Sequence, residues 1–256
     1  MALNPDTGKL VWYFQASPHD THDWDNVETP VLFDAEVNGH LRKLLAQAAR
    51  NGYFFVLDRT NGEHILSEPF VPLNWSKGLD SRGQPIPDPK KRPIADGSLL
   101  TLAAVGATNW MPPSFSPDTE LFYVNAIRGY SVSYLTDTDE KPAGYGGEGR
   151  TLWSQYVLEA LSYKTGKVQW SHPYPTFSST SGLSGPGILT TASKLLFSGD
   201  YSGNLIVYDA ATGAILWHFG MVHSLANGPI TFLLDGKQYV VVGAGDTLYA
   251  FTLAQQ

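Results

Sequence analysis

Short runs of apolar residues recur along the chain, separated by polar segments that carry Gly, Asp or Asn. The runs are rich in β-branched and aromatic residues, which favour strands, and they are too short to be helices with one apolar stripe. They lie at 53–57, 121–124, 195–199, 205–208, 238–243 and 247–251. The pattern therefore predicts an all-β protein.

One short motif, a polar turn with a glycine followed by a strand, occurs four times. Its copies lie at 4–12, 58–65, 162–170 and 209–217, with Gly8, Gly62, Gly166 and Gly213 in the turns. Glycine permits the positive φ that a tight hairpin requires. In three copies a tryptophan stands four residues after the glycine, namely Trp12, Trp170 and Trp217. We expect each indole to pack one repeat against the next.

The spacing of the motif predicts a β-propeller with about four blades. The intervals from Gly8 to Gly62 and from Gly166 to Gly213 each match one blade of four strands, and the longer middle interval matches a blade with inserted loops. We expect a single domain over residues 1–256, with long loops at 69–113 and 128–150, where Gly, Pro, Ser and Asp are frequent. We also expect the strand at 10–15 to complete the blade that ends near Phe251, because unpaired strand edges are costly.

Composition excludes several kinds of function. The net charge is −7, which disfavours general nucleic-acid binding, because phosphate contacts need clustered Lys and Arg. The chain has no cysteine, so disulfides, thiolate metal sites and cysteine nucleophiles are excluded. We expect no membrane span, because no run of 18 apolar residues exists. Residues 1–6 lack the basic and apolar regions of a signal peptide, so we expect none, and the compartment stays open.

Two imidazoles and three carboxylates are concentrated at 19–25. Oxygen and imidazole ligands suit Ca²⁺, Mn²⁺, Zn²⁺ or a lanthanide, so the candidate metal ligands are His19, His22, Asp23 and Asp25. The alternative is that these side chains bind the backbone of a turn and cap neighbouring strands.

Several segments together resemble the quinoprotein alcohol dehydrogenases, which depend on pyrroloquinoline quinone (PQQ). The matching segments are 6–12, 17–25, 50–62, 109–114, 228–231 and 235–240, so the resemblance covers nearly the whole chain. The chain is similar to the C-terminal half of that family's propeller. The resemblance implies a periplasmic family in which an eight-bladed propeller holds PQQ and a Ca²⁺ or lanthanide ion. Such a protein oxidises a small-molecule alcohol to an aldehyde or ketone.

The resemblance also implies roles for individual residues. Asp23 resembles the base that removes the alcohol proton as hydride passes to the quinone. Arg50 resembles the basic residue that contacts the quinone oxygens, and Asn109 with Trp110 resembles a segment that lines the cofactor. Asp25 resembles the extra carboxylate of lanthanide-using members.

The chain lacks counterparts to half of the family's site, including a metal-binding Glu and Asn. We therefore expect either that a second chain supplies the rest, most simply as a homodimer, or that the chain closes on itself. Two other functions stay open. One is a metal-dependent hydrolase that uses the His/Asp cluster, and the other is a non-catalytic propeller that binds a partner.

Overall fold

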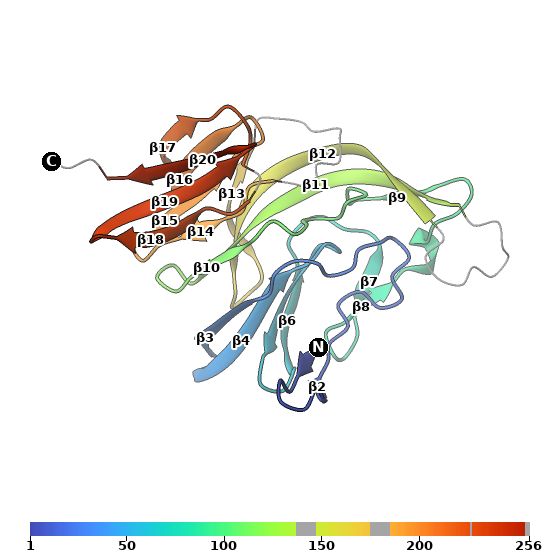
Figure 1. Ribbon diagram of the computed structural model, residues 1–256. Coiled ribbons are helices and arrows are strands. Elements are labelled where there is room, and N and C mark those ends of the chain that lie inside the picture. Colours follow the sequence, from blue (N-terminus) through green and yellow to red (C-terminus); the bar gives the residue numbers. More distant parts are fainter. Residues whose placement is uncertain (137–146, 175–184, 226, 254–256) are drawn as a thin grey trace.

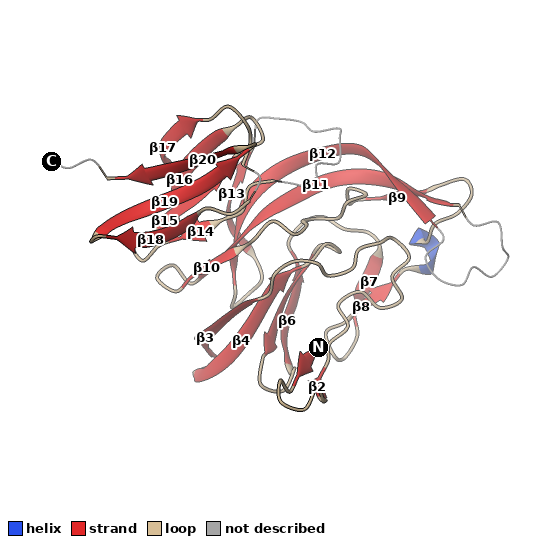
Figure 2. Ribbon diagram, viewed as in Figure 1, coloured by secondary structure: helices blue, strands red, loops and turns tan. Residues whose placement is uncertain are grey.

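The computed structural model describes residues 1–136, 147–174, 185–225 and 227–253, and nearly all of its regular structure is strand (Figure 2). The one helix in these residues is a short 3-10 helix, η1 (Pro89–Lys91). In this part of the chain no helix has the length and apolar character needed to cross a membrane. The prediction of an all-β protein is confirmed.

Four antiparallel sheets of three or more strands follow one another along the chain (Figure 1). The first contains β3 (Val31–Val37), β4 (His40–Ala48), β5 (Tyr53–Asp58) and β6 (His64–Pro69). The second contains β10 (Ser114–Ser116), β11 (Leu121–Leu135), β12 (Gly147–Ser162) and β13 (Val168–Pro173), and β9 (Ser98–Leu100) also pairs with β11. The third contains β14 (Leu189–Thr190), β15 (Leu195–Gly199), β16 (Asn204–Asp209) and β17 (Ile215–Gly220). The fourth contains β18 (Ile230–Leu234), β19 (Lys237–Ala244) and β20 (Thr247–Thr252).

Two smaller pairs complete the described strands: β1 (Ala2–Leu3) with β2 (Leu10–Trp12), and β7 (Ser76–Leu79) with β8 (Pro85–Pro87). Each pair of neighbouring large sheets encloses its own apolar core. Phe54 and Phe122, whose ring centroids are 5.0 Å apart, join the first and second sheets. Other buried clusters join the second to the third sheet and the third to the fourth. The large sheets are therefore packed one on the next, as the blades of a propeller are.

The predicted packing of tryptophan between repeats is confirmed at two junctions. A Cβ added to Gly62 would lie 2.7 Å from the ring of Trp12, and the Nε1–H of Trp12 donates to the carbonyl of Arg59 at 3.1 Å. The same contact recurs further along the chain. A Cβ on Gly213 would lie 2.6 Å from the ring of Trp170, whose Nε1–H donates to the carbonyl of Ala210 at 3.0 Å.

The other two repeats depart from this arrangement. Leu66 stands where a tryptophan would be expected, and its side chain lies 3.3 Å from a Cβ added to Gly166 of the next sheet. Trp217 keeps the tryptophan but is 45% exposed. Its ring packs edge-on against Phe251, with centroids 5.7 Å apart.

The predicted ring closure is wrong. Strand β2 pairs with β1, and the described part of β20 pairs with β19. Figure 1 places the N-terminal hairpin and the fourth sheet at opposite ends of the molecule. The physical reason is the contact between Trp12 and Gly62, which fixes the hairpin beside the first sheet.

The predicted loop at 128–150 is also wrong over its described part. Strand β11 continues to Leu135 and β12 begins at Gly147, so the two form one long hairpin, while residues 137–146 lie outside the described part of the chain. Ser131 and Ser133 are buried where β9 pairs with β11. These polar residues are buried strand positions next to a third strand of the sheet. In the predicted loop at 69–113, β7, β8, η1 and β9 are short elements among irregular segments.

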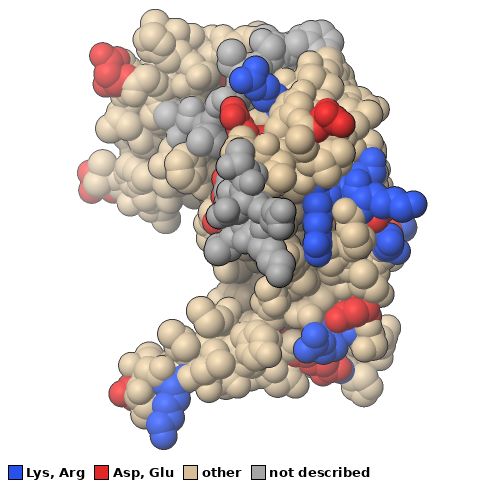
Figure 3. Space-filling view, turned by 90° about the vertical axis from the view of Figure 1, so that its right-hand side faces the viewer, with Lys and Arg blue, Asp and Glu red and all other residues tan. Residues whose placement is uncertain are grey.

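Charged side chains are sparse on the face drawn in Figure 3, where uncharged surface predominates. Lys, Arg, Asp and Glu together make up only 16% of the residues.

Candidate functional site

The loop between β2 and β3 carries most of the predicted site, and a buried asparagine holds its first part. Asn51, which is 0% exposed, donates from Nδ2 to the carbonyl of Ala16 at 2.8 Å and to Oγ of Ser17 at 3.0 Å. The hydroxyl of Ser17 in turn donates to the carbonyl of Trp24 at 2.9 Å. Asn51 follows β4, so the first sheet fixes the position of the loop.

Asp20 shapes the turn that follows. Its two carboxylate oxygens accept from the backbone N–H groups of His22 and Trp24, at 2.9 and 2.6 Å. Trp24 is buried, and its Nε1–H donates to the carbonyl of Ala104 at 3.2 Å. Asp23 and Asp25 flank this anchor, and their side chains are 65% and 63% exposed. Asp23 has a φ of 60°, a left-handed conformation in which Asp is enriched.

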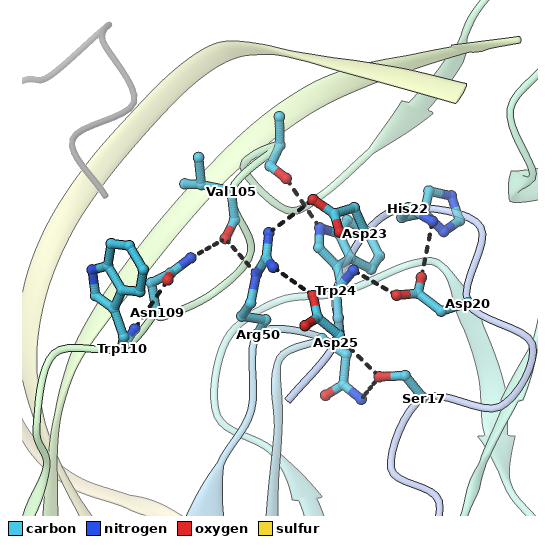
Figure 4. Close-up of polar contacts among 12 residues, drawn as sticks. Ser17, Asp20, His22, Asp23, Trp24, Asp25, Arg50, Val105, Asn109 and Trp110 are labelled. Carbon is cyan, nitrogen blue, oxygen red and sulfur yellow. Dashed lines mark hydrogen bonds and ion pairs between the residues drawn. The ribbon is translucent and has the colours of Figure 1, made fainter. Parts of the chain in front are cut away.

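Arg50 joins both carboxylates to a second loop (Figure 4). Its Nη1 lies 2.8 Å from Oδ1 of Asp25, and its Nη2 lies 3.7 Å from Oδ2 of Asp23. Its Nε–H donates to the carbonyl of Val105 at 3.2 Å. The guanidinium is therefore held by three groups, and the Arg50 side chain is only 10% exposed.

Asn109 binds the same Val105 carbonyl as Arg50 does. Its Nδ2 donates to Val105 at 3.2 Å, and its Oδ1 accepts from the backbone N–H of Trp110 at 3.0 Å. Asn109 is 4% exposed, whereas Trp110 is 57% exposed. The structure therefore brings Asp23, Asp25, Arg50 and Asn109 together around the Val105 carbonyl and the Arg50 guanidinium.

The described residues do not bring His19, His22, Asp23 and Asp25 together as one set of metal ligands. The Nε2 of His22 lies 2.9 Å from the carbonyl of Lys91, and because a carbonyl only accepts, this nitrogen carries a proton and is unavailable to a metal. The His22 ring stacks on Trp24 with centroids 4.5 Å apart, and burial lowers its pKa. The described residues contain no group of three or more His, Cys, Asp or Glu side chains that could hold a metal ion.

Glu28 belongs to the same region and was not predicted. It is 4% exposed, and neither of its carboxyl oxygens has a hydrogen-bond partner. Burial raises its pKa to about 8. A lone glutamate ahead of a strand gives no sign of burial in the sequence, so this residue could not have been predicted from local pattern.

The group offers parts of a site for a planar quinone, but it does not offer a complete metal site. Arg50 offers a fixed cation, and the exposed indole of Trp110 offers a flat aromatic face. A Ca²⁺ ion takes six to eight oxygen ligands. Asp23 and Asp25 offer two carboxylates, and both already pair with Arg50. The described residues alone therefore do not make a metal site.

Comparison with known families agrees with this geometry. Residues 1–96, which contain Asp23, Asp25 and Arg50, match the family described as glucose/ethanol/alcohol dehydrogenase, beta-propeller domain, whose model is named PQQ. Residues 147–255 match the family described as outer membrane protein assembly factor BamB.

Individual relatives lead to the same family. The chain is 39% identical to quinoprotein alcohol dehydrogenase PedH of Pseudomonas putida, an alignment that covers 96% of this chain and 42% of PedH. The crystal structure of quinohemoprotein alcohol dehydrogenase from Comamonas testosteroni is similar at 33% identity with a TM-score of 0.85, over 95% of this chain and 38% of that one. A europium-containing methanol dehydrogenase is similar at 30% identity with a TM-score of 0.80, over 94% and 43%. The chain thus spans about two fifths of the length of these relatives, and it is similar to part of the β-propeller of the quinoprotein alcohol dehydrogenases.

Proposed function

We propose that this chain provides one side of the quinone site of an alcohol dehydrogenase. The observation that carries the proposal is that Arg50 binds two separate loops. Its guanidinium pairs with Asp25 and Asp23, and its Nε–H shares the Val105 carbonyl with Asn109. Three segments distant in sequence thereby meet around one buried cation.

Each residue has a defined part in the proposed reaction. A bound PQQ supplies the acceptor for the hydrogen and electron pair that leave the alcohol carbon. Asp23, exposed and 3.7 Å from Arg50, takes the proton of the alcohol hydroxyl. Arg50 would donate hydrogen bonds to the oxygens of the cofactor, and Trp110 would provide an aromatic contact for it. Asn109 fixes the backbone of Trp110 and so orients that face.

The rest of the site comes from outside the described residues in this proposal. A Ca²⁺ or lanthanide ion would find Asp23 and Asp25 here and would need further oxygen ligands from elsewhere. Those ligands would come from another part of the polypeptide or from a second copy of this chain in a two-fold dimer. Mass by light scattering, with and without the quinone and Ca²⁺, distinguishes these sources. The second-copy arrangement requires a dimer.

Dye-linked oxidation of primary alcohols, after addition of PQQ with Ca²⁺ or a lanthanide, tests the proposed chemistry. D23N keeps the shape of the side chain and removes the base, so we expect a rate at least about a hundredfold lower with cofactor binding retained. D34N is the matched control, because Asp34 pairs with Arg59 at 2.8 Å on a half-exposed surface away from the site. Equal activity in D23N and D34N would contradict the role of Asp23.

A second candidate is a non-catalytic module that binds a partner. It is supported by the match of residues 147–255, which contain none of the site residues, to the BamB family. Specific partner binding by the R50Q variant, with no turnover by the wild-type chain, would favour it. The third candidate, a metal-dependent hydrolase, has less support, because the Nε2 of His22 is bound to the carbonyl of Lys91 and the described residues contain no group of three or more possible metal ligands.

A further inference from the structure

A tight turn over residues 103–106 binds two residues of the site through its backbone (Figure 4). The turn is closed by a hydrogen bond of 2.9 Å from its last N–H to its first carbonyl. Of its two central residues, Val105 accepts the Nε–H of Arg50 at 3.2 Å, and Ala104 accepts the indole N–H of Trp24 at 3.2 Å. Both central carbonyls of this turn are therefore bound by side chains of the site.

Gly106, the last residue of the turn, lies directly against the main chain of Arg50. A Cβ added to Gly106 would lie 2.7 Å from the carbonyl oxygen of Arg50 and 2.9 Å from its Cβ. The φ of Gly106 is 94°, a conformation that glycine adopts without steric cost. The next residue, Ala107, donates its N–H to the same Arg50 carbonyl at 2.7 Å. The turn thus approaches Arg50 this closely because position 106 has no side chain.

The other side of the turn is held by the second sheet. The N–H of Ala104 donates to Oγ1 of Thr151, in β12, at 3.0 Å. Leu152 is an extra residue in the pairing of β12 with β11, so Thr151 stands next to a β-bulge. A bulge changes the direction in which a neighbouring side chain points. A Cβ added to Gly149, also in β12, would lie 3.0 Å from the Cβ of Ala104, so the strand and the turn are close together.

We propose that the 103–106 turn positions the Arg50 guanidinium, with Gly106 and Thr151 as the positioning residues. Gly106 sets how closely the turn approaches Arg50, and Thr151 sets the direction of the turn. The guanidinium is a rigid planar fork, so a fixed Val105 carbonyl at Nε also fixes where the other two nitrogens point. The effect on cofactor affinity rests on the proposed function, whereas the effect on Arg50 itself does not.

The Arg50 guanidinium can be observed directly by ¹⁵N NMR, with its Nε–H signal assigned from its loss in R50K. T151V keeps nearly the same shape but removes the acceptor of the Ala104 N–H, so we expect the Arg50 signal to move from its wild-type position. T151S keeps the hydroxyl group and should restore that position. An Arg50 signal that is unchanged in T151V, or that moves equally in T151S, would overturn the proposal.

G106A should move the Arg50 signal further, because its methyl group overlaps the main chain of Arg50. G213A is the matched control, since Gly213 also has a positive φ and a Cβ there would lie 2.6 Å from the Trp170 ring at another joint. It should leave the Arg50 signal in place although it destabilises the fold. An equal movement in G213A and G106A would overturn the proposal. If G106A does not fold, the comparison of T151V with T151S decides.

PQQ binding adds a second readout. Affinity should fall at least about tenfold in G106A, since displacement of the cation reduces the fraction of the protein that is competent to bind. T151S should bind as the wild type does. If PQQ binds to no form of the chain while the Arg50 signal still depends on Gly106 and Thr151, the proposed function fails and the positioning role stands.

Discussion

The indole of Trp170 lies against Gly213 of the next sheet, so closely that a Cβ on this glycine would come within 2.6 Å of the ring. The indole N–H donates to the carbonyl of Ala210 at 3.0 Å, three residues before that glycine. Trp12 makes the same pair of contacts with Gly62 and Arg59. One residue pair thus defines the joint between blades, and its consequences for stability can be measured separately from function.

G213A should destabilise the protein more than G236A does. Both glycines have a φ near 75°, so alanine strains the backbone by about 1 kcal/mol at either position. Only Gly213 has a ring against it, because a Cβ on Gly236 would meet nothing within 4 Å. Overlap with Trp170 should add about 1–3 kcal/mol to the loss of unfolding free energy. Denaturant unfolding checks this, and equal losses in the two variants would contradict the joint.

Removal of the two indoles should also have unequal effects. W170A deletes a ring seated on glycine together with its hydrogen bond, so we expect a loss of about 2–3 kcal/mol. W217A deletes the residue at the same position in the next repeat, where the ring is 45% exposed, and should cost about 1 kcal/mol. Thermal or urea unfolding of both variants provides the comparison. A larger loss in W217A would show that exposure does not reflect the strength of the joint.

The repeat was readable in the sequence because each joint depends on residues close to a turn, a tryptophan and a glycine at fixed spacing. Arg50 and Asn109 were found only through the family resemblance, since their contact through Val105 joins segments more than 50 residues apart. The β11–β12 hairpin was missed because Ser131 and Ser133 give it a polar pattern, although both are buried and β9 pairs with β11 at these positions.

Two misses in the site have one physical cause. The His22 ring is bound to the carbonyl of Lys91, 69 residues away, and the backbone carbonyl of the buried Glu28 is bound by Gln47, 19 residues away. Local pattern carries no information about such partners. The sequence therefore indicates which residue types are available, and tertiary packing decides which of them can act.

Asp20 should act as a structural residue whose loss also disturbs the site. D20A removes the acceptor of the His22 and Trp24 backbone N–H groups, so we expect a loss of about 1–2 kcal/mol in unfolding free energy. Because Asp23 lies between those two residues, its carboxylate should also move away from Arg50. D6A is the control, a substitution in an exposed turn. An undisturbed Arg50 signal in NMR spectra of D20A would contradict this role.

Stability should fall in mild acid partly because of His22. Burial lowers its pKa in the folded protein, so between that pKa and 6.5 the unfolded chain binds more protons than the folded chain. The free energy of unfolding therefore decreases as the pH falls below about 6.5. H22Q cannot be protonated and should lose less stability between pH 7 and 5 than the wild type. The exposed His40 supplies the control, H40Q, whose pH dependence should match the wild type.

Quinone binding by the isolated chain is the most direct test of the account. PQQ is titrated into the wild-type protein, R50Q and R59Q at pH 7, with binding followed by absorbance and folding verified by circular dichroism. Arg59, like Arg50, pairs with an aspartate at 2.8 Å, but it lies away from the site. If Arg50 binds the quinone, we expect saturable binding to the wild type and to R59Q, with affinity at least about tenfold lower in R50Q. A folded wild-type chain that binds no quinone, or one that binds it as tightly in R50Q, would contradict the account.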